Sequence, residues 1–161
     1  MAGKRSTLDW LCEAIAIAAL AGMIGLTAAN LANLPDQMPV HFGASGKPDG
    51  WGSKNTLWVL TLVNVGLYIV MTLASRYQRL INLPMRVDRD APEVQQLLRT
   101  MAIVLKAGLM VLLLYLDWAM VNTGLGQTDG LGPEFLPVFL AATFLPLIWF
   151  LAKLRKFQKL S

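Results

Sequence analysis

Four long apolar segments alternate with polar segments along the chain. The apolar segments cover about residues 8–31, 56–75, 99–121 and 134–152. A helix of about 20 residues crosses the roughly 30 Å hydrocarbon core of a bilayer, so each segment is long enough to span a membrane. The pattern predicts an all-α integral membrane four-helix bundle, with residues 1–161 forming a single membrane domain.

Composition agrees with a membrane protein whose main partner is the lipid bilayer. Hydrophobic residues make up 55% of the chain and charged residues 15%, against about 25% charged in ordinary globular proteins. The net charge of +4 does not indicate a nucleic-acid partner, because the basic residues flank apolar segments. The single cysteine, Cys12, lies inside an apolar segment, so it predicts neither an internal disulfide nor a cysteine-based metal site.

Lysine and arginine are distributed unequally between the two sides of the predicted bundle. Eleven lie at the amino terminus, in the connector ending at Arg99, or in the carboxyl-terminal tail, whereas only Lys47 and Lys54 flank the other side. The positive-inside rule then places both termini in the cytoplasm and residues 32–55 outside the cell's inner (plasma) membrane. A cleaved signal peptide is the alternative for the first segment; we expect a retained helix, because the segment contains Glu13 and runs directly into the polar loop.

Small residues recur every four positions in the first apolar segment. They form two series: Ala14, Ala18 and Gly22, and Ala21, Gly25 and Ala29. This spacing lets helices approach closely in lipid. It predicts close packing on a neighbour, either within the chain or in a homodimer.

Three charged residues lie away from the ends of the apolar segments: Glu13, Lys106 and Asp117. Glu13 lies about 8 Å and Lys106 about 10 Å from the cytoplasmic ends of their helices at 1.5 Å per residue, so we predict an intramembrane ion pair. A proton or ion pathway, or extension of Lys106 to the cytoplasmic surface, stays open. Asp117 lies near the outer end of its helix, where we expect it to contact the polar loop through Lys54 or His41; contact with interfacial water is the alternative.

The polar loop at residues 34–54, LPDQMPVHFGASGKPDGWGSK, contains the only histidine of the chain and a distinctive residue order. The order comprises Pro39, His41, Phe42, Gly46, Pro48, Asp49, Gly50, Trp51, Gly52 and Lys54. Over residues 24–71 the chain resembles the domain of unknown function 1648 family. That family occurs in small bacterial membrane proteins and at the start of SdpI-type immunity proteins. The resemblance implies a role in SdpI-like immunity to an extracellular peptide or in sensing envelope stress.

The loop residues alone allow three kinds of function. Prolines and glycines suit a rigid extracellular cap, and Phe42 and Trp51 suit binding of an extracellular peptide or membrane protein partner. His41, Asp49 and Asp117 form a candidate site for a divalent metal, since one imidazole and two carboxylates can ligate such an ion. Recognition or ligand binding is the predicted function. The alternative is a small transporter or a metal-dependent membrane enzyme; no catalytic motif and no cofactor is predicted.

Overall fold

The computed structural model describes residues 5–158 of the chain. Its elements are α1 (Thr7–Asn30), β1 (Gln37–Phe42), β2 (Pro48–Ser53), α2 (Thr56–Arg76), the 3-10 helix η1 (Gln78–Leu80), α3 (Pro92–Gly124), α4 (Phe135–Leu154) and the 3-10 helix η2 (Arg155–Phe157). Four helices are long and apolar enough to cross a membrane. The predicted four-helix membrane fold is therefore confirmed, with a small two-stranded sheet in addition.

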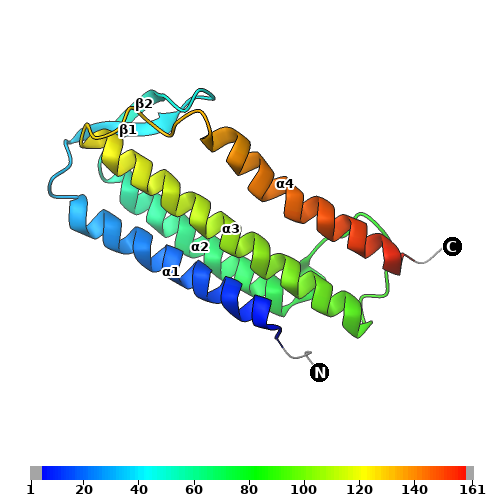
Figure 1. The fold of residues 1–161 in the computed structure, drawn as a ribbon. Coiled ribbons are helices and arrows are strands. Elements are labelled where there is room, and N and C mark those ends of the chain that lie inside the picture. The colour runs from blue at the N-terminus through cyan, green and yellow to red at the C-terminus, as the bar shows by residue number, and fades with distance from the viewer. Residues whose placement is uncertain (1–4, 159–161) are drawn as a thin grey trace.

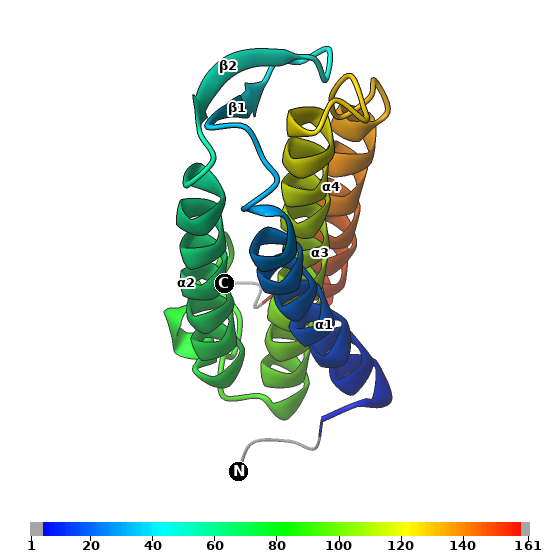
Figure 2. The same ribbon diagram turned by 90° about the vertical axis from the view of Figure 1, so that its left-hand side faces the viewer.

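Helix α3 is the centre of the bundle, because it contacts α1, α2, α4 and β1. Helix α4 packs mainly against α3, as Figure 1 shows. The strands lie over one end of the bundle, across the ends of α2 and α3 (Figure 2). The described chain begins and finishes near the opposite end. Lys4 and Lys159, which contributed to the predicted orientation, lie outside the described residues.

Helix α3 is longer than the sequence predicted. It covers Pro92–Gly124 instead of residues 99–121, and at 1.5 Å per residue it measures about 50 Å. The hydrocarbon core is only about 30 Å thick, so α3 projects beyond it. Pro92 starts the helix, a position that proline suits because the first amides of a helix need no intrahelical acceptor.

A side-chain cap fixes the start of α1. The Ser6 hydroxyl accepts a hydrogen bond from the Asp9 amide at 3.1 Å, and the Asp9 carboxylate accepts one from the Ser6 amide at 2.9 Å. This reciprocal arrangement satisfies two amides that the helix itself leaves without acceptors. It explains why the helix begins at Thr7.

The connector between α2 and α3 packs against the bundle although it is rich in charged residues. Four alternate apolar side chains from it pack against α3 and α4: Ile81, Leu83, Met85 and Val87. They cover a buried cluster made by Val94, Leu98, Phe150 and Leu154. A β-bridge between Val87 and Gln158 joins the connector to the end of the described chain. Apolar burial thus holds the connector against the bundle.

Strands β1 and β2 form an antiparallel hairpin where the sequence predicted only a loop. Met38 pairs with Gly52 and Pro39 with Trp51, and the register becomes irregular around His41. A Cβ atom at Gly50 would lie 2.8 Å from the His41 Cβ, so the close approach of the two strands requires glycine there. The sequence did not predict these strands, because the many glycine and proline residues of this segment are typical of turns.

The tip of the hairpin is fastened to the loop between α3 and α4. The Leu131 amide donates a hydrogen bond to the Gly46 carbonyl at 2.8 Å, and the Tyr115 hydroxyl donates one to the Leu131 carbonyl at 2.9 Å. Gly46 has φ 75°, and a Cβ atom on it would meet the Gly132 backbone. We call this contact between Gly46 and residues 130–132 the latch.

We predict that Gly46→Ala opens the latch, because the substitution adds both a steric clash and an unfavourable positive φ. Limited proteolysis of the purified protein should cleave residues 43–47 faster than in the wild type. Gly66→Ala is the control, since a Cβ atom at Gly66 would have no neighbour within 4 Å. Equal cleavage rates in wild type and Gly46→Ala would contradict the latch.

Candidate functional site

The inner face of the hairpin packs on the end of the bundle. Met38 is fully buried and Pro39 is buried beside it. Partly buried Val40 and Phe42 pack against the same apolar cluster, which comprises Leu34, Met38, Leu57, Met120 and Val121. The cluster joins the segment after α1 to the beginning of α2 and the end of α3. Of the predicted loop residues, Phe42 therefore anchors the hairpin on this face, whereas Pro39 is buried at the position paired with Trp51.

The outer face of the hairpin carries the exposed side chains. Trp51 is 65% exposed, on the strand position opposite Pro39. The His41 imidazole contacts the Asp49 carboxylate through Nδ1 and Oδ1, and both side chains are largely exposed. An exposed tryptophan beside a polar pair on a rigid strand provides apolar contact area with hydrogen-bonding groups next to it.

Lys54 fixes the base of the hairpin. Its ammonium group lies 3.1 Å from the Asp36 carboxylate and donates a hydrogen bond to the Leu34 carbonyl at 3.1 Å. The Lys54 amide also donates to the Asp36 carbonyl at 3.2 Å. Lys54 therefore ties the beginning of the hairpin to its end. With the latch at Gly46, the hairpin is held at both its base and its tip.

Asp117 does not contact the hairpin, so the predicted bond to Lys54 or His41 is wrong. Its carboxylate is fully buried and accepts a hydrogen bond from the Thr27 hydroxyl, at 3.3 Å to Oδ2 and 3.4 Å to Oδ1. Thr27 belongs to α1, so the partner comes from the helix packed alongside α3. Lys54 and His41 are meanwhile paired with Asp36 and Asp49.

The three residues of the candidate metal site do not come together either. Its members His41 and Asp49 meet on the hairpin, but Asp117 bonds Thr27 within the bundle. Among residues 5–158, no group of three or more histidine, cysteine, aspartate or glutamate side chains has the arrangement needed to hold a metal ion.

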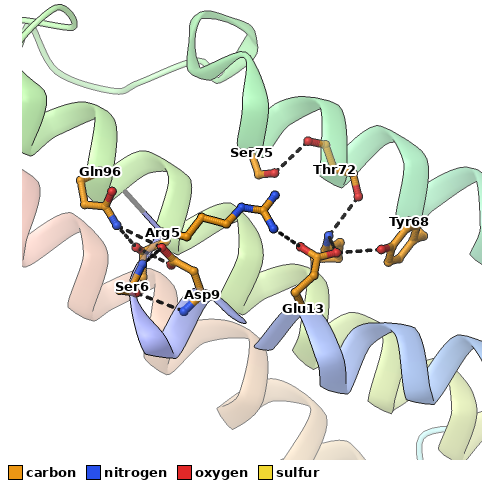
Figure 3. A network of polar contacts seen from close by, with 10 residues as sticks. Arg5, Ser6, Asp9, Glu13, Tyr68, Thr72, Ser75 and Gln96 are labelled. Carbon is orange, nitrogen blue, oxygen red and sulfur yellow. Dashed lines mark hydrogen bonds and ion pairs between the residues drawn. The ribbon is translucent and has the colours of Figure 1, made fainter. Parts of the chain in front are cut away.

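Glu13 and Lys106 meet in the other half of the bundle, as their matched depths predicted. Lys106 Nζ lies 2.7 Å from Glu13 Oε1, and the lysine side chain is fully buried. Helix α2 completes the site from a third side: the Lys106 ammonium donates to the Thr72 hydroxyl at 2.9 Å, and the Tyr68 hydroxyl donates to Glu13 at 2.7 Å. Figure 3 shows this junction, with Arg5 placed near Glu13 at 3.9 Å.

A second polar layer lies one helical turn nearer the described amino-terminal end. Asp9 accepts hydrogen bonds from the Thr100 hydroxyl at 2.8 Å and the Gln96 amide at 3.1 Å, both on α3 (Figure 3). Sequence reasoning missed these partners, together with Tyr68 and Thr72. Their signal was weak, because neutral polar residues are ordinary at helix ends and on helix surfaces.

An apolar layer separates the two ends of the bundle. The buried side chains of Cys12, Ala16, Ala19, Ile103, Ala107 and Met110 form it. Ala16, Ala19 and Met110 lie along their helices between the junction at Lys106 and the Thr27–Asp117 contact, whereas Cys12 and Ile103 lie beside the junction. The small residues of α1 in this cluster are Ala16 and Ala19. The six small residues of the two predicted series are all exposed, so the structure does not bury them against another helix of the chain, and their packing in a homodimer stays a prediction. The ionic junction thus joins three helices on one side of an apolar core.

We predict that Glu13→Leu or Lys106→Leu alone destabilises the protein by about 3–5 kcal/mol, because each leaves a buried charge without its partner. Glu13→Leu/Lys106→Leu should lose less than the sum of the two single losses. The free energies of unfolding of the wild type, the two single variants and the double variant, measured in detergent by heat or denaturant, form a double-mutant cycle. Additive losses would show that the two charges do not interact.

Comparison with known proteins supports the resemblance for one part of the chain. Residues 18–65 match the family described as "Domain of unknown function (DUF1648)". An "Uncharacterized protein" of Archaeoglobus fulgidus is 41% identical over 59 residues, which is 32% of this chain and 32% of that relative. The match therefore spans about a third of the relative's length. No solved structure matches the chain significantly. The chain is thus a multi-pass membrane protein in which the second half of α1, the hairpin and the first half of α2 match DUF1648.

Proposed function

We propose that this protein is a multi-pass protein of the inner membrane whose hairpin recognises a peptide or protein ligand outside the cytoplasm. The observation that carries the proposal is Trp51, which is 65% exposed on a hairpin held to the bundle. Exposed aromatic side chains of this kind supply much of the binding energy in protein interfaces.

The fixed geometry of the hairpin supports recognition. Its base is held by Lys54, its inner face by the cluster around Met38, and its tip by the latch at Gly46. A binding surface that is ordered before the ligand arrives loses less conformational entropy on binding. Trp51, His41 and Asp49 are therefore presented to a ligand without a separate folding step.

The part of the chain that matches DUF1648 includes the entire hairpin. The resemblance to SdpI-type immunity proteins therefore bears on the same residues that form the exposed surface. We propose that recognition serves immunity against an extracellular peptide or sensing of envelope stress. Transport is less favoured, because the apolar layer around Ala16 and Met110 lies between the buried charges at Lys106 and Asp117.

The proposed orientation places both termini in the cytoplasm and the hairpin outside. The basic residues support it, because arginine and lysine concentrate at the end of the bundle opposite the hairpin. Reporter fusions after Ser75 and Ser161 should read cytoplasmic, and a fusion after Gly126 should read external. An external signal from the fusion after Ser161 would overturn the orientation.

If the hairpin recognises a ligand through Trp51, Trp51→Ala should abolish the function of the protein in cells. A deletion strain is screened for sensitivity to extracellular peptide toxins and envelope stresses, and the phenotype is then complemented with variants. Trp51→Ala should fail to complement, whereas Trp10→Ala should restore growth. Trp10 is the control because it is similarly exposed, at 59%, but lies at the end of α1 opposite the hairpin. Expression is matched by immunoblotting. Full complementation by Trp51→Ala would contradict recognition through the hairpin.

A further inference from the structure

A basic cavity lies at the end of the bundle opposite the hairpin. Its volume is about 230 Å³, and it opens between the end of α2, the connector and the beginning of α3. Three guanidinium groups line it, from Arg76, Arg79 and Arg89, together with one carboxylate, from Asp90. Gln95 of α3 contributes a neutral polar side chain. The charged groups around this cavity therefore sum to a net positive charge, which favours an anion.

The guanidinium groups keep donors free for a ligand. Arg79 donates to Asp90 at 3.2 Å, and Arg89 donates through Nη1 to the Ile81 carbonyl at 2.9 Å. Each guanidinium has five N–H donors in a planar fork, so these bonds use only part of its capacity. The bonds hold Arg79 and Arg89 against the connector while other N–H groups stay available. Such forks match the oxygen geometry of phosphate groups.

The cavity lies where the apolar span of α2 ends, and we expect lipid headgroups to begin there. Arg76 is the last residue of α2, whose preceding residues form an apolar membrane span. Tyr77 and Leu80, which follow it, are 61% and 65% exposed. Tyrosine is common at the boundary between hydrocarbon and headgroups, and an exposed leucine there can contact the beginning of an acyl chain. Arginine side chains and exposed apolar side chains therefore lie next to each other at the end of α2, where they can contact the headgroup and the acyl chains of one lipid.

A second, wider cavity adjoins the first and adds another arginine. Its volume is about 650 Å³, and Arg89 lines both cavities while Arg86 lines only the second. Apolar connector residues, among them Leu83 and Met85, complete its wall. Arg89 lines both cavities, so the basic side chains extend along the connector from one cavity to the other.

We propose that the cavity at Arg76, Arg79 and Arg89 binds the headgroup phosphate of an anionic phospholipid of the phosphatidylglycerol type. Basic pockets at the cytoplasmic ends of membrane helices bind such headgroups through charge and hydrogen bonds. The bound lipid joins α2, the connector and α3, and so stabilises the turn between the two helices. This site is separate from the hairpin and independent of the recognition function.

Native mass spectrometry of the full chain in neutral detergent tests the proposal. The protein is titrated with phosphatidylglycerol and, separately, with phosphatidylcholine of the same acyl chains. The wild type should bind the first phosphatidylglycerol at least about tenfold more tightly than phosphatidylcholine, as expected for charge-assisted hydrogen bonds. The double variant Arg76→Gln/Arg79→Gln should bind the first phosphatidylglycerol about tenfold or more weakly than the wild type does, with unchanged affinity for phosphatidylcholine.

Lys153→Gln/Arg155→Gln is the matched control. It removes the same charge at the end of α4, from residues that line neither cavity, and should change binding less than about threefold, since its effect is only long-range. If the double Arg variant does not fold, Arg76→Gln alone carries the test, with a loss of about threefold or more. Equal affinities for the two lipids in the wild type, or equal losses in the two double variants, would overturn the site.

A soluble phosphate is the other source of the same chemistry. Glycerol phosphate is therefore added as a competitor to the wild-type protein loaded with phosphatidylglycerol. At concentrations equal to the lipid it should not displace the lipid, because it lacks the acyl chains that Tyr77 and Leu80 contact in the proposed complex. Displacement at equal concentration would overturn the assignment to a lipid.

Discussion

The buried ammonium group of Lys106 constrains how the helices of this protein meet. A charge in hydrocarbon costs about 3 kcal/mol on insertion scales when it is unpaired, and Lys106 is fully buried. Helix α1 supplies Glu13 at 2.7 Å, and α2 supplies Thr72 at 2.9 Å and the ring of Tyr68. Because α1 and α2 must each bring side chains to the Lys106 ammonium of α3, these contacts fix how far the three helices are shifted along one another.

That register has consequences at both ends of the bundle. Towards the hairpin, α1 and α3 continue side by side, so that Thr27 meets Asp117 and the ends of α2 and α3 form the platform for Met38. Towards the other end, the long α3 projects far enough for the connector and α4 to pack on it through Leu98 and Phe150. One face of the protein thus presents the exposed Trp51, and the other presents the basic cavity.

The pattern of apolar and polar residues predicted correctly those features that depend on a single segment, such as the four long helices. The hairpin was missed because glycine and proline dominate its strands, and its pairing depends on the docking of Met38 beneath it. The connector also has a pattern that spans several residues. Its apolar side chains alternate from Ile81 to Val87, as in a strand, but only packing against α3 and α4 buries them. Asp117 was assigned to the loop by depth alone, although depth does not say which side of a helix a residue occupies.

The sequence by itself determined that four segments cross a membrane, because apolar length is a local property set by bilayer thickness. It also brought Glu13 and Lys106 to one depth, because rise per residue in a helix is fixed. Only the tertiary structure decided that Thr27 is the partner of Asp117, that Gly46 closes the latch, and that arginines from the end of α2, from η1 and from the connector share a cavity. These contacts join separate elements, and their formation depends on helix rotation and packing, which a single segment's composition does not encode.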